Sequence, residues 1–144
     1  MSANQTKPAT SFWIISVIAL LWNLTGIMSF TMDITMSAEA LAALPDAQRE
    51  LYESTPVWLK FVYGVAVFSG LLGSILLLMR KSSAKRVFMV SLIAILIQML
   101  YSLFMTSSVE AFGAASIIMP IIVIGIGVFL VWYAGHAKTK GWLN

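Results

Sequence analysis

The stretch LLLMRKSSAKRV, residues 76–87, joins two long apolar runs through a short basic segment. The segment carries four cations, Arg80, Lys81, Lys85 and Arg86. Apolar residues dominate from 57 to 79 before it and from 87 to 106 after it. A helix rises about 1.5 Å per residue, so each run is long enough to cross the roughly 30 Å hydrocarbon core of a bilayer. The pattern therefore predicts two membrane spans that turn back in a positively charged loop.

Two similar apolar runs complete the chain, at 11–36 and 114–134. In hydrocarbon the backbone N–H and C=O groups must bond within their own segment, so each run is expected to be a helix. The first run is longer than the roughly 7–15 apolar residues of a secretory signal peptide, and we interpret it as a retained span. We predict an all-α polytopic membrane protein whose four transmembrane helices form an up-down bundle.

The composition agrees with this class and excludes several others. Of the 144 residues, 60% are hydrophobic and 10% are charged, whereas soluble domains carry about 25% charged residues. The length fits a single domain over 1–144. The chain has no cysteine, which excludes disulfides, iron–sulfur clusters and thiol nucleophiles. Its net charge of +3 lies in short loops without an aromatic-interleaved basic face, so no nucleic-acid partner is expected.

Charged residues segregate to opposite sides of the four runs. Seven of the nine Lys and Arg residues lie in three places, namely Lys7, the segment 80–86, and the pair Lys138 and Lys140. The six acidic residues lie on the other side of the runs. Because cytoplasmic loops carry the excess of Lys and Arg, the pattern predicts a multi-pass protein of the bacterial inner membrane with both termini in the cytoplasm.

The loop 36–55, between the first two spans, is acidic and is therefore predicted to face outward. Ser37 is a suitable N-cap for a short helix, and Pro45 ends that helix and starts a second one that contains Arg49 and Glu53 at i,i+4 spacing. We expect two short helices over the outer mouth. They are interpreted either as a lid or as a packed connector.

Polar side chains within the apolar runs are the candidate functional residues, because each needs a partner in hydrocarbon. Asn23 and Gln98 lie near the middle of the first and third spans, and Tyr101 lies one turn beyond Gln98. A midplane site for a small neutral solute is one interpretation. The other is a hydrogen bond between the two amides that holds the helices together, worth about 0.6–2 kcal/mol.

Asp33 and Lys60 both lie about one turn inside the predicted outer boundary, on consecutive spans. They suit an outer vestibule that binds a solute or carries a proton or cation. Alternatively, they form a structural ion pair, or their charged groups reach the headgroup layer separately.

Metal and catalytic signals are weak. Met28, Met32 and Met36 recur on one face of the first span, and thioethers suit Cu(I), although flexible Met is also common packing material. This is the one metal candidate, and we predict no cofactor. His136 has no acidic residue on its own side of the membrane, which excludes a His-based triad. The sequence does not predict an enzyme.

Several segments resemble those of a family of small four-helix bacterial inner-membrane proteins. They are LWNLTG (21–26), MSAEALAALP (36–45), RELYE (49–53) with Pro56, AVF-x-G (66–70) with Leu72 and Gly73, and GWL (141–143). Members of that family are mostly uncharacterised, and some carry an automatic "sugar transporter" label. The resemblance implies a small transport-related membrane protein without an established activity.

Two functional hypotheses follow. In the first, the protein binds or moves a small solute, with Asn23, Gln98 and Tyr101 at the midplane and Asp33 and Lys60 at the outer mouth. Four short spans enclose little volume, so a transporter of this size is expected to form a homo-oligomer. In the second, the protein is an accessory or structural subunit that packs against a larger membrane partner through small residues on its helices. In both, the lipid bilayer is the surrounding partner.

Overall fold

The computed structural model describes residues 6–105, 110 and 112–144. Within these residues the chain is helical and contains no strand. The four long helices are α1 (Thr10–Ile34), α4 (Val57–Leu78), α5 (Ala84–Met105) and α7 (Ala115–Thr139). All four are long and apolar enough to cross a membrane by length and composition, as predicted. The predicted end of the third span at Thr106 lies outside the described residues.

The last two long helices are longer than the apolar runs that predicted them. Helix α7 continues past the predicted end at residue 134 to Thr139, and α5 begins at Ala84 rather than at residue 87. Lys138 lies in the last turn of α7, where a positive charge interacts favourably with the helix dipole. Helical hydrogen bonding thus extends beyond the apolar segments into the charged ends.

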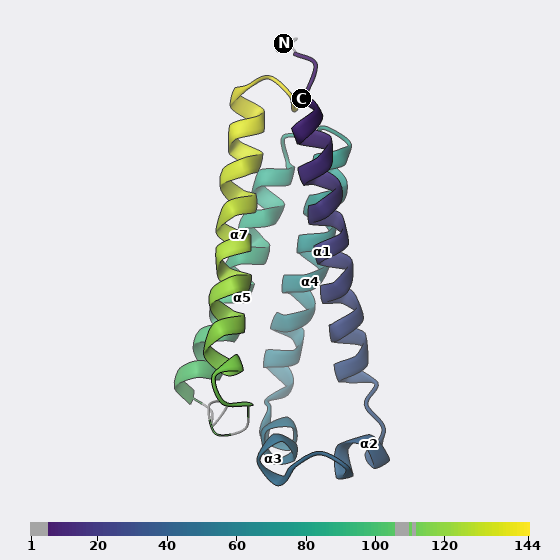
Figure 1. The fold of residues 1–144 in the computed structure, drawn as a ribbon, viewed down its shortest axis with the longest axis vertical. Coiled ribbons are helices and arrows are strands. Elements are labelled where there is room, and N and C mark those ends of the chain that lie inside the picture. Colours follow the sequence, from purple (N-terminus) through teal and green to yellow (C-terminus); the bar gives the residue numbers. More distant parts are fainter. Residues whose placement is uncertain (1–5, 106–109, 111) are drawn as a thin grey trace.

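Consecutive long helices pack against each other: α1 packs on α4, α4 on α5, and α5 on α7. Both ends of the chain and the α4–α5 loop lie at one end of the molecule, and α2 (Ala38–Ala42) and α3 (Asp46–Ser54) lie at the other (Figure 1). We call these the basic end and the loop-helix end. The basic end contains Lys7, Arg80, Lys81, Lys85, Arg86, Lys138 and Lys140.

The hydrophobic core lies toward the basic end. Phe12 of α1 is fully buried, and its ring stacks on Tyr133 of α7 and contacts Trp142. Around it pack residues of all four long helices and the C-terminal segment, including Leu77, Phe88 and Leu143. This cluster holds α1 and α7 together at the basic end, although the two helices are not adjacent in the chain.

Two helix C-termini at the basic end have the same hydrogen-bond pattern. After α7, Trp142 N donates to Ala137 O at 3.0 Å, and Gly141 has φ 77°. After α4, Lys81 N donates to Leu76 O at 2.9 Å. Both are Schellman motifs, which place one residue in the left-handed region.

In the second motif the left-handed residue is Arg80, with φ 58°, rather than the usual glycine. The hydrogen bonds of its side chain explain why an arginine occupies this position. Arg80 Nε donates to Trp142 O at 2.7 Å, and Nη2 donates to Thr6 O at 3.0 Å. Its backbone O accepts from Asn144 N at 2.8 Å. One residue therefore joins the α4–α5 loop to both terminal segments.

Small residues bring α4 close to α1 and α5. A Cβ at Gly73 would lie 2.7 Å from the ring of Phe88 on α5, and one at Gly70 would overlap Oδ1 of Asn23 on α1. In addition, Ser91 Oγ of α5 donates to Ala66 O of α4 at 2.7 Å, so a hydrogen bond also joins these two helices. Close approach through small residues is the usual packing device of membrane helices.

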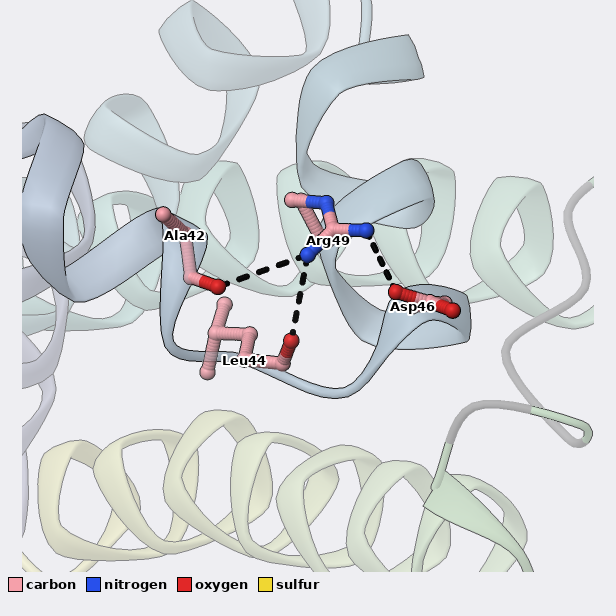
Figure 2. Close-up of polar contacts among 4 residues, drawn as sticks. All are labelled: Ala42, Leu44, Asp46 and Arg49. Atoms are coloured by element: carbon pink, nitrogen blue, oxygen red, sulfur yellow. Dashed lines mark hydrogen bonds and ion pairs between the residues drawn. The ribbon is translucent and has the colours of Figure 1, made fainter.

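At the loop-helix end, Ser37 Oγ caps α2 by accepting from Ala40 N at 3.1 Å. Figure 2 shows Arg49 of α3 directed back toward α2, where its guanidinium reaches the carbonyl oxygens of Ala42 and Leu44 and pairs with Asp46. The expected pair with Glu53 is therefore not the one that forms. Arg49 turns toward the helix N-terminus because both a carboxylate and the free carbonyls at the end of α2 lie there.

Candidate functional site

A cavity of about 250 Å³ opens at the loop-helix end, and we call it the mouth cavity. Residues from α1, α3, α4 and α5 line it. Its polar lining includes Asp33, Tyr52, Lys60, Tyr63 and Gln98. The structure thus brings together three of the five solute-binding residues predicted from the sequence. It also shows that α3 forms part of the cavity wall, with Leu51, Tyr52 and Thr55.

Asp33 and Lys60 face the same cavity without direct contact. Among the described residues the one ion pair within 4.0 Å is Arg49–Asp46. Asp33 instead accepts a hydrogen bond from the hydroxyl of Tyr52. The expected Asp33–Lys60 ion pair is therefore not observed, and α3 supplies a hydrogen-bond partner for the carboxylate instead.

The Tyr52 hydroxyl shows the effect of this arrangement. Burial raises the pKa of Tyr52 above its ordinary value, and the charge of Asp33 and the hydrogen bond to it raise this pKa further. A neutral phenol is the form that donates to a carboxylate. Tyr52 therefore stays protonated at neutral pH and attaches α3 to α1.

A second cavity, of about 360 Å³, lies deeper, and we call it the inner cavity. All four long helices line it, with Asn23 from α1, Tyr63 from α4, Ser91 and Gln98 from α5, and Pro120 from α7. Tyr63 and Gln98 line both cavities. The two cavities therefore adjoin, and these two side chains stand between them.

The two amides within the long helices make different contacts. Asn23 Nδ2 donates to Ala19 O of its own helix at 2.8 Å and to Ser74 Oγ of α4 at 2.9 Å, so both of its hydrogens are used and one of them joins α1 to α4. Within the described part of the chain, the Gln98 side chain has no hydrogen-bond partner, although it is half-buried. The hypothesis of a direct Asn23–Gln98 bond is therefore wrong. Ser74 lies closer to Asn23 and satisfies it.

Tyr101 lies outside the linings of both cavities. Its ring packs edge-on against Trp58 of α4, with the ring centroids 5.3 Å apart. Tyr63, in contrast, is a lining residue that the sequence reasoning missed. The sequence does contain a signal for Tyr63, because it follows Lys60 at i,i+3 and therefore lies on the same helix face.

Of the three methionines, Met28 and Met32 lie on α1 and Met36 lies beyond its end at Ile34. The Met28 and Met32 side chains are 59% and 67% exposed. A metal site needs ligands that point toward one centre. Across residues 6–105, 110 and 112–144, no group of three or more His, Cys, Asp and Glu side chains could hold a metal ion. The His136 ring stacks on Trp132 with centroids 5.2 Å apart.

Comparison with protein-family models, with curated proteins and with solved structures found no match to this chain.

Proposed function

We propose that this chain is an integral protein of the bacterial inner membrane that binds a small polar solute in the two adjoining cavities. In this proposal the four long helices cross the bilayer as an up-down bundle. The basic end faces the cytoplasm, because Lys and Arg are retained on that side. The mouth cavity then opens outward, and a solute enters it beside Asp33 and Lys60 and reaches the inner cavity past Tyr63 and Gln98.

The observation that carries the proposal is the unpartnered amide of Gln98 between the two cavities. A half-buried amide without a partner in an apolar environment is costly, and polar residues at this depth usually serve a site. The Gln98 amide presents two donors and an acceptor to whatever enters the cavities. Asn23 differs, since its amide N–H groups are already bonded to protein.

The lining groups indicate the class of solute. Tyr63 and Gln98 supply a hydroxyl and an amide group, and Asp33 and Lys60 supply one charge of each sign at the mouth. Groups of this kind recognise a compact solute with several hydroxyl, amide or ionic groups, of the size of a sugar or an amino acid. Nothing in this set requires a chemical step, and we propose binding or passage rather than catalysis.

A second candidate function is that of an accessory subunit. It is favoured by an apolar groove of about 510 Å³ on the outside of α1 and α4, lined by Phe30, Phe61, Gly64 and Phe68. Gly64 lies beside Phe30, so the groove reaches the backbone of α4. A helix of a larger membrane partner, or of a second copy of this chain, fits such a surface.

The test is a thermal-shift screen of the purified protein against sugars and amino acids, with Gln98→Leu beside the wild type. We expect one solute class to raise the melting temperature of the wild type and to leave Gln98→Leu unchanged. Ligand-free Gln98→Leu should melt at or above the wild-type temperature, because a costly polar group has been removed.

Asn23→Leu is the matched control. It should lower the stability by about 0.6–1.7 kcal/mol through loss of its interhelical hydrogen bond, and it should keep the solute response. A flat screen, together with co-purification of a stoichiometric larger partner seen by native mass spectrometry, favours the accessory subunit instead.

A further inference from the structure

A third hollow lies at the basic end, on the outer surface between α5 and α7. It is a groove of about 510 Å³, lined among others by Lys85 and Leu92 of α5 and by Val128, Trp132, His136 and Thr139 of α7. It shares no residue with the mouth cavity or the inner cavity. We call it the basic groove.

The polarity of the basic groove changes along its length. Lys85, His136 and Thr139 lie toward the α4–α5 loop and the C-terminal segment, at the charged end of the molecule. Leu92 lies seven residues further along α5, which corresponds to about 10 Å along the helix axis. Val128 lies eight residues before His136 on α7, at a similar depth. The groove therefore begins polar and cationic and continues apolar.

The Lys85 side chain is seated in the groove rather than extended away from it. A Cβ at Gly135 would lie 3.4 Å from both Nζ and Cε of Lys85, so the ammonium group lies over the backbone of α7. The lack of a side chain at residue 135 makes this position accessible. Lys85 is thus held between the two helices at the mouth of the groove.

No Asp or Glu side chain neutralises this charge. The six acidic residues are Asp33, Glu39, Asp46, Glu50, Glu53 and Glu110, all of which lie toward the other end of the long helices. Among the described residues, Lys85 forms no ion pair. The cationic mouth therefore complements an anion from outside the chain, and the apolar floor complements a hydrocarbon chain.

We propose that the basic groove binds an anionic phospholipid of the leaflet at the basic end. The lipid phosphate lies against Lys85 beside the imidazole of His136, and one acyl chain lies along Leu92 and Val128. The His136 ring is held in position by its stacking on Trp132. Basic pockets between membrane helices recognise anionic headgroups in this way, through a charge at headgroup level and an apolar surface below it.

The test is lipid retention by the purified full-length protein, measured by native mass spectrometry with phosphatidylglycerol and phosphatidylethanolamine as probes. We expect the wild type to retain phosphatidylglycerol in preference. Lys85→Gln should weaken that retention about fivefold, the change that one interfacial cation makes. Lys85→Arg should restore it, because the charge at the groove mouth is kept.

Lys81→Gln is the matched control, since Lys81 is an exposed cation of the α4–α5 loop directly before α5 and lies outside the groove. It should retain phosphatidylglycerol as the wild type does. Equal retention of the two lipids by the wild type overturns the proposal. So does an equal loss in Lys81→Gln and Lys85→Gln, which shows general surface charge rather than a site.

A third arm separates the lipid from its headgroup. Val128→Trp fills the apolar floor and should weaken phosphatidylglycerol retention, and excess inorganic phosphate should not displace the lipid from the wild type. Displacement by phosphate, with no effect of Val128→Trp, shows an anion site without an acyl-chain site and contradicts the proposal. None of these variants changes the solute cavities, so the result is independent of the proposed solute binding.

Discussion

The basic end and the loop-helix end of the molecule are built differently. At the basic end, Phe12, Leu77 and Phe88 fill the space between the helices, and Arg80 joins the α4–α5 loop to both terminal segments. Toward the loop-helix end, two cavities lie between the helices instead of a packed core, and polar side chains such as Gln98 contribute to their linings. The closely packed core therefore lies in one half of the molecule, and the cavities of the proposed solute site lie in the other.

This difference has a physical reason. Lipid is as apolar as the helix surfaces, so membrane helices are held together by close packing and hydrogen bonds rather than by burial of apolar area. A cavity between such helices removes packing contacts. The helices around the cavities therefore depend on the close packing of the basic end to stay together. Substitutions in the two halves should accordingly have different consequences.

The largest effect is expected at Phe12, which is fully buried at the basic end. Phe12→Ala leaves a large void beside Tyr133 and Trp142 and should lower the free energy of unfolding by about 3 kcal/mol. Phe61→Ala is the counterpart, because Phe61 is 72% exposed on the outside of α4 and makes few contacts to lose. Its effect should be below about 0.5 kcal/mol. Denaturant unfolding in detergent measures both, and equal losses would contradict the proposed division of the molecule.

A smaller loss is expected from filling the contact between α4 and α5. Gly73→Ala forces the Phe88 ring to move, since the new Cβ would lie 2.7 Å from it, and should cost about 1–3 kcal/mol. Gly125→Ala on α7 provides the comparison, because nothing lies within 4 Å of the new Cβ. It should be neutral or stabilise by up to about 1 kcal/mol through helix propensity. If the two variants unfold alike, helix contact through Gly73 is unimportant.

Arg80 provides a test with an unusual ranking. Arg80→Ala and Arg80→Gly both lose the side-chain bonds to Trp142 and Thr6, so both should be less stable than the wild type. Glycine adopts a φ of 58° without the cost of a Cβ, which is roughly 1–2 kcal/mol for an L-residue. Arg80→Gly should therefore unfold at higher denaturant than Arg80→Ala. The opposite order would mean that the left-handed turn after α4 does not persist in solution.

The smallest effect is expected at the loop-helix end, at high pH. The pKa of Tyr52 is raised above its ordinary value of 10.0 by burial and by Asp33. A raised pKa in the folded state gives stability that is fully present below the unfolded pKa and is lost as the pH rises through the folded pKa. The wild type should therefore lose more stability above about pH 10 than Tyr52→Phe does. Thermal melting across pH 8 to 12 checks this, and identical profiles would show that Tyr52 does not hold α3.

The sequence was a good guide to the four long helices and to part of the cavity linings. Hydropathy predicted the four helices, because their apolar runs are long and uninterrupted. Asp33, Lys60 and Gln98 were found because a charge or an amide within such a run is conspicuous. The other residues and contacts of the cavities could not be predicted, because the helices are uniformly apolar. A helix that is apolar on every side does not indicate which face meets its neighbours, so the position of Tyr63 and the Asn23–Ser74 bond came from the structure.

Two polar side chains, Gln98 and Ser16, allow the two halves of the molecule to be compared directly. Gln98 stands between the two cavities of the loop-helix end, whereas Ser16 of α1 is fully buried toward the basic end. The chain has no cysteine, so a single introduced thiol reports one position without background. Cysteine is smaller than glutamine and only slightly larger than serine, so both replacements are small steric changes.

Labelling of Gln98→Cys and Ser16→Cys in intact cells, with a membrane-impermeant thiol reagent, compares the two positions under native conditions. We expect Gln98→Cys to react from the outside, because its thiol faces the mouth cavity, and Ser16→Cys to react after denaturation alone. The same low reactivity at both positions would show that the mouth cavity is closed to water and would contradict a solute site at Gln98.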